Sequence, residues 1–195
     1  MERPILFNTS MVRAILEGRK TVTRRVVRRK ELDAVLSSPA RTENPDIPDC
    51  QIIECLCTAP CEVGDILWVR ETWCESLGKA GKYFYRAYAG PRDEMKEYAH
   101  SFNHWKPSIH MPRKAARIFL KVTGVRPERL REMVLADVLM EGIQETDTYE
   151  GTWDFWHHAW DSTIKPADRP VYGWAANPWV WVISFERVGQ PEHGV

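Results

Sequence analysis

The chain has 195 residues, of which 44% are hydrophobic and 28% are charged, and its 27 Lys and Arg residues balance 27 Asp and Glu residues. This composition is typical of a single globular domain and excludes a disordered or fibrous protein. The zero net charge excludes a protein that coats DNA non-specifically, because such binding needs many contacts between cations and phosphates. No apolar run approaches the roughly 20 residues of a membrane span, and no secretory signal is recognisable, so we expect a cytoplasmic protein with no membrane partner.

The first 30 residues combine a strand, a helix and a concentration of positive charge. Residues 4–7 predict a short strand, and apolar residues at positions 11, 14 and 15 predict a helix that Ser10 can cap. Gly18 suits the position just after the end of such a helix, so the basic residues that follow begin a second strand. Nine Lys and Arg residues stand against two Glu residues in this segment, which gives it a net charge of +7.

The rest of the chain alternates predicted strands with helices and two long insertions. We expect irregular insertions at about 31–61 and 89–114, because both segments contain several prolines and lack periodicity. Further strands are predicted at 65–69, 83–88, 117–123 and 179–185. A short helix is predicted at 135–140, ended by Gly142, and a longer one from Thr152 to about Ser162. This order predicts an α+β fold in one domain over residues 1–195, built as a small mixed β-barrel with flanking helices.

Three tryptophans recur on one face of the longer predicted helix, at positions 153, 156 and 160. A stripe at this spacing is typical of a helix that packs against a core, and we favour that interpretation. Base stacking by the indole rings is the alternative.

The segment Lys20-Thr21-Val22-Thr23 has two interpretations. An edge strand uses Thr for β-propensity and Lys to discourage aggregation. Alternatively, Lys20 loses basicity through burial or through the nearby arginines at 19, 24 and 25, and then takes a proton from a threonine hydroxyl. In an ideal strand, Lys20 and Thr23 face opposite sides, so the second interpretation requires a bend near Gly18.

Four cysteines lie close together, at positions 50, 55, 57 and 61. Their spacing lacks the C-x2-C pattern of the strongest zinc signatures, so we predict no metal ligand and no cofactor, with structural zinc as the alternative. Glu71 follows a predicted strand, and Glu141 ends a predicted helix. Each is by default a solvated or ion-paired carboxylate. Either becomes a candidate site residue only if the fold brings it to Lys20.

Six segments together resemble the ASCH-domain proteins, especially their phage and prophage branch. These segments are residues 3–7, 11–25, 64–73, 111–113, 141–142 and 177–181. The resemblance implies a PUA-like β-barrel with a cleft between the first helix and the basic strand. It also implies a role in binding RNA or modified nucleosides.

One branch of this superfamily, the N4-acetylcytidine amidohydrolases, uses a K-T-x-T motif and a distant glutamate. Lys20-Thr21-Val22-Thr23 matches that motif. The resemblance therefore implies that Lys20 is the general base and Thr23 the nucleophile. Glu141 matches the glutamate by position and would be the proton donor. The chain is much longer than the compact members of that branch, and its two insertions extend it.

Two functions follow as hypotheses. The first is an RNA-binding or nucleoside-binding ASCH domain that deacylates N4-acetylcytidine through Lys20, Thr23 and Glu141. Its expected ligand-binding residues combine basic side chains with aromatic stacking faces: Arg19, Thr21, Arg24, Arg25, Trp68, Arg70, Glu71, Trp73 and Arg113. The alternative is a non-catalytic phage or prophage interaction protein that contacts a host protein through the long loops and a Trp-rich surface.

Overall fold

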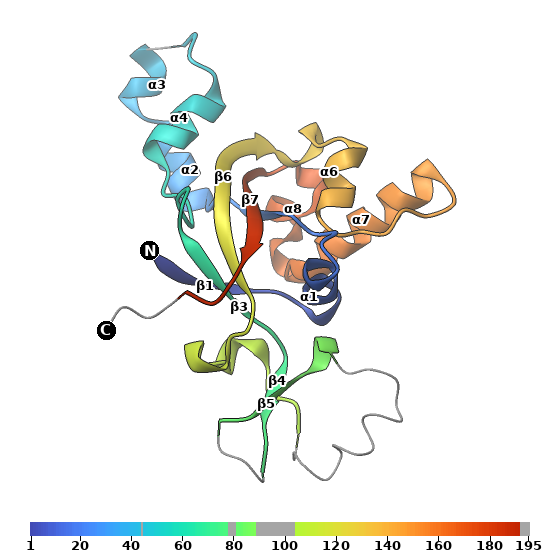
Figure 1. The fold of residues 1–195 in the computed structure, drawn as a ribbon. Helices are drawn as coiled ribbons and strands as arrows, with labels where there is room; N and C mark the ends of the chain where they lie inside the picture. The colour runs from blue at the N-terminus through green and yellow to red at the C-terminus, as the bar shows by residue number, and fades with distance from the viewer. Residues whose placement is uncertain (44, 78–80, 89–103, 192–195) are drawn as a thin grey trace. The chain divides into compact units, whose positions relative to one another are not determined.

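The computed structural model describes residues 1–43, 45–77, 81–88 and 104–191 (Figure 1). The chain forms two compact units that alternate along the sequence. Unit 1 comprises Met1–Arg19, Gly64–Lys121 and Glu186–Val195, and unit 2 comprises Lys20–Val63 and Val122–Phe185. Our expectation of a single domain stays a prediction. Among the helices of the described segments, none combines the length and the apolar character needed to cross a membrane.

The main sheet has five strands in the order β1-β3-β6-β7-β2. These strands are β1 (Glu2–Leu6), β2 (Val22–Val26), β3 (Ile66–Arg70), β6 (Phe119–Arg129) and β7 (Trp179–Val188). Strand β1 is parallel to β3, whereas β3 with β6 and β2 with β7 are antiparallel, so the sheet is mixed. Figure 1 shows β6 and β7 side by side, and both strands contribute residues to each unit.

The predicted α+β class is confirmed, but the sheet of the described residues does not close into a barrel. Strands β1 and β2 stand at the two ends of the strand order. Residues 83–85, which we assigned to the barrel, form β5 (Tyr83–Tyr85) and pair with β4 (Trp73–Glu75) in a separate two-stranded sheet. A run of β-forming residues predicts a strand but not its partner, because pairing depends on tertiary packing.

In unit 1, helix α1 (Thr9–Leu16) follows β1, and its cap differs from our prediction. The Asn8 side chain caps the helix by accepting a hydrogen bond from the Met11 N–H at 2.9 Å, and Ser10 donates its hydroxyl to the same Asn8 oxygen. Gly18 lies just after the helix end with φ +76°, as predicted, because a residue with a Cβ is strained in that conformation. The buried core of this unit is formed by Trp73, Met111, Ala115, Ala116 and Phe119.

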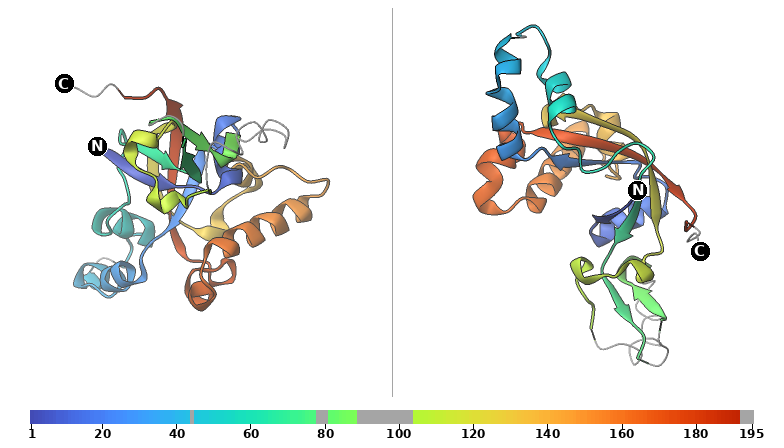
Figure 2. Two further views of the ribbon diagram at one scale, coloured as in Figure 1. Left: turned by 90° about the horizontal axis from the view of Figure 1, so that it is seen from below. Right: turned by 90° about the vertical axis from the view of Figure 1, so that its left-hand side faces the viewer.

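Our prediction that the first insertion is irregular is wrong, because this segment is helical. It contains α2 (Arg29–Leu36), α3 (Pro39–Glu43) and α4 (Asp49–Leu56), and α2 packs against α4 (Figure 2). Pro39 is the first residue of α3 and Pro48 is the N-cap of α4, where a missing N–H does not interrupt a helix. These prolines mark helix starts. In the second insertion, residues 89–103 lie outside the described residues.

Several short 3-10 turns connect the longer elements. In unit 1 they are η1 (Arg86–Tyr88), η2 (Ser108–His110) and η3 (Arg113–Ala115). In unit 2 they are η4 (Leu130–Glu132), η5 (Pro166–Asp168) and η6 (Trp174–Ala176).

The helices after β6 complete unit 2. They are α6 (Leu135–Met140), α7 (Tyr149–Thr163) and α8 (Arg169–Tyr172). Helix α6 has the predicted bounds, whereas α7 begins earlier than predicted, because Thr148 rather than Thr152 accepts the capping hydrogen bond. Trp156 and Trp160 are buried in the core and Trp153 packs against them, which confirms the core-packing interpretation of the Trp stripe.

Candidate functional site

Lys20 is held at the start of the basic strand by backbone contacts with the end of α6. Lys20 forms an isolated antiparallel bridge with Glu141, and the Thr21 N–H donates to the Met140 carbonyl at 2.9 Å. Glu141 is the C-cap residue of α6, and Gly142 follows it with φ +88°. Two segments far apart in the sequence are thereby fixed side by side, each presenting an ionisable side chain.

The Lys20 and Glu141 side chains form a fully buried ion pair. The Lys20 ammonium donates to Glu141 Oε2 at 2.5 Å, to the Glu141 carbonyl at 2.9 Å and to the Val22 carbonyl at 2.8 Å. The two side chains are 0% and 2% exposed. Burial lowers the pKa of Lys20 against the opposing effect of Glu141, and the positive charges of Arg25 and Arg24 lower it further. This lysine is therefore easier to deprotonate than one in water.

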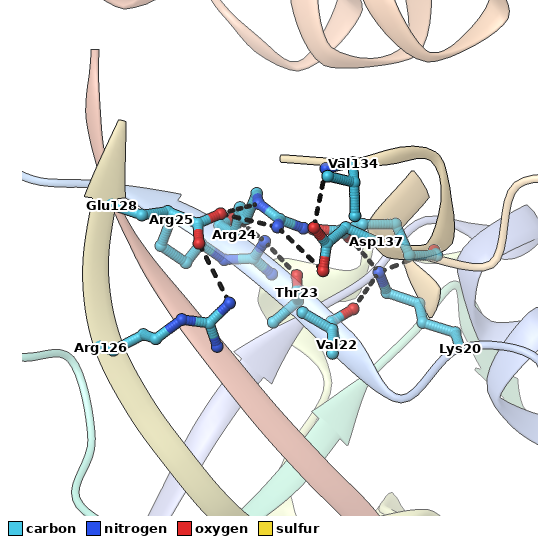
Figure 3. Close-up of polar contacts among 10 residues, drawn as sticks. Lys20, Val22, Thr23, Arg24, Arg25, Arg126, Glu128, Val134 and Asp137 are labelled. Carbon is cyan, nitrogen blue, oxygen red and sulfur yellow. Dashed lines mark hydrogen bonds and ion pairs between the residues drawn. The ribbon is translucent and has the colours of Figure 1, made fainter. Parts of the chain in front are cut away.

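Arg24 connects the pair to a wider group of carboxylates. Its Nη1 donates to Glu141 Oε1 at 3.2 Å, and its Nε and Nη2 donate to Glu128 Oε1 at 2.9 and 2.7 Å. Its Nη2 lies 3.7 Å from Asp137 Oδ1. Glu128 belongs to β6 and Asp137 to α6, so the guanidinium joins three elements of unit 2 (Figure 3).

Thr23 lies next to Arg24 on β2 and is likewise buried, at 1% exposure. The Thr23 Oγ1 accepts a hydrogen bond from Arg25 Nη1 at 2.9 Å, and the same Nη1 donates to the Arg24 carbonyl at 3.0 Å. Arg25 therefore fixes the position of the threonine hydroxyl.

Of the other predicted residues, Arg19 pairs with Glu17, and Thr21 has an exposed side chain. The remaining ones belong to unit 1. The Arg70 guanidinium lies 5.5 Å from the ring centroid of the partly buried Trp68. Trp73 is buried, with the Lys106 ammonium 4.9 Å from its ring centroid. Arg113 donates to Glu2 at 2.7 Å.

Glu71, the other carboxylate that we considered as a partner for Lys20, lies in unit 1 and pairs with Arg117. The Arg117 Nε and Nη2 donate to the two Glu71 oxygens at 2.9 and 3.0 Å. Burial raises the pKa of Glu71, and Arg117 acts against this rise. The Arg117 guanidinium also lies 4.1 Å from the Tyr85 ring centroid. The structure therefore joins Lys20 with Glu141, and Glu71 with an arginine.

Sequence reasoning missed Glu128, Asp137 and Arg117. Glu128 and Arg117 lie on or next to strand β6 and carry no local signal of their partners. Asp137 had such a signal, because it stands three residues after the N-cap of α6, where an acidic side chain reaches back to the cap N–H.

The four cysteines of the first insertion differ in exposure. Cys57 and Cys61 are buried, Cys50 is partly buried and Cys55 is exposed. Burial raises the pKa of Cys57. Within the part of the chain that the structure describes, no three or more His, Cys, Asp or Glu side chains are grouped so that they could hold a metal ion.

Comparison with known proteins returned no relative. No family model matches the chain, and neither a curated protein nor a solved structure matches it.

Proposed function

We propose that this chain is a PUA-like protein of the ASCH type that binds RNA or a modified nucleoside and deacylates N4-acetylcytidine. The observation that carries the proposal is the 2.5 Å hydrogen bond between a fully buried lysine and a buried glutamate, on the segment with the K-T-x-T pattern. The family assignment rests on the sequence resemblance. The catalytic assignment rests on the chemistry that this pair supports.

A buried Lys and Glu pair can supply a base and an acid at the same time. The ion pair and the neutral pair hold the same number of protons, and burial disfavours the two charges. In the neutral pair, Lys20 is a free amine that accepts a proton and Glu141 is a carboxylic acid that donates one. The lowered pKa of Lys20 favours this state.

The reaction then proceeds in two balanced stages. Lys20 takes the proton of the Thr23 hydroxyl, the oxygen attacks the acetyl carbonyl carbon, and the bond to N4 breaks as Glu141 gives its proton to the departing amine. Cytidine leaves and the acetyl group remains on Thr23 as an ester. Water attacks this ester, one of its protons goes to Glu141, and Lys20 returns a proton to the threonine oxygen. Acetic acid leaves, and all three residues regain their initial protonation.

The position of Arg25 supports Thr23 as the nucleophile. Its Nη1 donates to the Thr23 oxygen at 2.9 Å. A cationic donor at this oxygen stabilises negative charge as the hydroxyl loses its proton. The hydroxyl proton is left available for the base.

The test is release of cytidine from N4-acetylcytidine by the purified chain, followed by chromatography. We expect Lys20→Ala and Thr23→Ala each to lower kcat/KM by roughly 10²-fold or more, since each removes a group that acts in the transition state. The control is Arg29→Gln, at an arginine on α2 with a 60% exposed side chain that pairs with Asp33. Absence of turnover by the unmodified chain, or full activity of Thr23→Ala, would sink the mechanism.

A non-catalytic binding protein is the second candidate, and one observation favours it. Lys20, Thr23 and Glu141 are each 2% exposed or less, which is typical of a structural ion-pair network. Catalysis would require a movement that opens Thr23 to the substrate. Titration with single-stranded RNA and with free nucleosides at two salt concentrations separates binding modes, because phosphate contacts weaken steeply with salt.

A further inference from the structure

We infer that Arg24 is a positioning residue that directs one oxygen of Glu141 toward Lys20 and keeps the other away from it. The inference rests on the proposed function of Lys20 and Glu141. It differs from our sequence-based expectation, in which Arg24 contacts the ligand. The Arg24 side chain is 0% exposed, so its guanidinium is turned inward, toward carboxylates.

The two oxygens of Glu141 each receive a different cation. Oε2 accepts from Lys20 at 2.5 Å, and Oε1 accepts from Arg24 at 3.2 Å. A carboxyl group held at only one oxygen can rotate about its last torsion angle, which is soft. The second contact therefore fixes which oxygen, and which lone pair, faces the lysine.

Glu128 anchors the guanidinium that makes this contact. Two nitrogens of Arg24 donate to a single oxygen of Glu128, at 2.7 and 2.9 Å. The other oxygen of Glu128 accepts from Arg126 at 3.0 Å. Because a guanidinium is planar and rigid, fixing its Nε and Nη2 also fixes the direction of Nη1 toward Glu141. A lysine at position 24 would keep the charge but lose this geometry.

The charge of Arg24 also acts on Lys20. The charged groups around Lys20 are Glu141, Arg24 and Arg25, with Glu128 and Asp137 next to Arg24. Removing Arg24 removes a positive charge near the ammonium and removes one of the cations that compete with Lys20 for the Glu141 carboxylate. Both changes stabilise protonated Lys20, so the free base would form only at higher pH.

The kinetic test compares Arg24→Gln with Arg24→Lys on N4-acetylcytidine. We expect Arg24→Gln to lower kcat about tenfold or more with KM within about twofold, and to move the acidic limb of the pH profile to higher pH. We expect Arg24→Lys to keep the pH profile but to recover only part of kcat. The lysine restores the positive charge but lacks the planar guanidinium that donates to Glu128 and Glu141 together. A rise in KM with unchanged kcat would overturn the inference and assign Arg24 to ligand binding.

A second measurement does not depend on turnover. The pKa of Lys20 is followed by NMR of its side-chain Nζ and Cε signals, assigned through their loss in Lys20→Met. We expect the pKa of Lys20 to rise in Arg24→Gln, to fall in Glu141→Gln, and to stay near its original value in Arg29→Gln, at an arginine that pairs with Asp33 on α2. An unchanged Lys20 pKa in Arg24→Gln would overturn the inference.

These readouts separate the two proposals. If the unmodified chain does not hydrolyse N4-acetylcytidine but the Lys20 pKa shifts as expected, the proposed reaction fails while the role of Arg24 toward the pair holds. If Arg24→Gln does not fold, Glu128→Gln replaces it, since this change keeps the shape and an acceptor oxygen but removes the charge that anchors Arg24. We then expect kcat to fall a few-fold with unchanged KM, and an unchanged kcat would overturn the inference.

Discussion

In the part of the chain that the structure describes, each unit contains a buried glutamate paired with a cation, and the two pairs differ in what the cation can do. In unit 1, Glu71 is held by Arg117, which donates to both of its oxygens. In unit 2, Glu141 is held by Lys20 at one oxygen and by Arg24 at the other. An arginine side chain does not lose its proton in a protein, whereas a buried lysine does so readily.

This difference distinguishes a structural pair from one that can transfer protons. Burial raises the pKa of Glu71, but its partner has no accessible neutral form, so the pair has no alternative protonation state of equal charge. Burial lowers the pKa of Lys20, which brings the neutral pair with Glu141 within reach. The choice of Lys or Arg, rather than burial alone, decides whether the pair suits acid and base chemistry.

The largest expected effect comes from replacing the lysine of the Lys20–Glu141 pair by an arginine, so that this pair resembles the Arg117–Glu71 pair. Lys20→Arg keeps a cation beside Glu141 but removes the amine that acts as the base in the proposed mechanism. We expect cytidine release to fall roughly 10²-fold or more, as in Lys20→Ala. Circular dichroism and thermal unfolding check that the larger side chain is accommodated. A Lys20→Arg variant with near-normal kcat would remove lysine deprotonation from the mechanism.

Breaking the Arg117–Glu71 pair should lower the free energy of unfolding, by an amount that depends on pH. Arg117→Met leaves Glu71 buried at 1% exposure without its bidentate partner, and we expect a loss of about 3 kcal/mol at pH 7.5. The folded-state pKa of Glu71 is already raised, and losing Arg117 raises it further. A group whose pKa is higher in the folded state than in the unfolded state stabilises the fold at pH values below its unfolded-state pKa. This stabilisation is lost as the pH rises through the folded-state pKa.

The loss in Arg117→Met is therefore expected to be smaller at pH 5 than at pH 7.5. It should grow by up to about 1.4 kcal/mol per pH unit over the range in which folded Glu71 is protonated in Arg117→Met but ionised in the unmodified chain. Urea unfolding of both proteins at the two pH values measures this difference. Glu71→Gln in the Arg117→Met background is the control, and it should abolish the pH dependence. A loss that is equal at both pH values contradicts our account of Glu71.

The smallest expected effect concerns the backbone that presents Glu141. Gly142 has φ +88°, and we expect Gly142→Ala to destabilise the fold by about 1 kcal/mol because a Cβ is strained there. The control is Gly124→Ala, since a Cβ at Gly124 would meet the Ser184 side chain at an ordinary 3.7 Å. Its effect should stay within about 0.5 kcal/mol. Equal losses in urea unfolding would show that left-handed geometry at position 142 does not matter.

Local sequence patterns predicted the strand and the helix ends next to Lys20 and Glu141. The ion pairs and the strand pairing depend on tertiary contacts, which these patterns do not contain. Glycine positions marked the ends of α1 and α6, and both glycines have positive φ. The position of Glu141 at a helix end left it a default ion-paired carboxylate, and only the resemblance assigned it a catalytic role; the structure shows that it contacts Lys20. Its role in catalysis stays a prediction.

The arginine network was outside the reach of sequence reasoning. Arg24 and Glu128 are more than a hundred positions apart, and nothing near either residue signals the other. Helices α3 and α4 were missed for a local reason, because Pro39 and Pro48 at their starts looked like interruptions. The barrel was predicted from the number of strands, but a count of strands does not say which ones pair.

The pairing of β2 with β7 has a consequence for synthesis on the ribosome. Val22 lies opposite Ser184, so the strand that carries Thr23 and Arg24 has no partner on this side until β7 has been made. At about 5–20 residues per second, that delay is roughly 10 to 30 s. During this time the valines and arginines of β2 remain without their final neighbours. The candidate site is therefore completed late, after translation has passed most of the chain, and its assembly depends on the nascent chain staying free of aggregation until then.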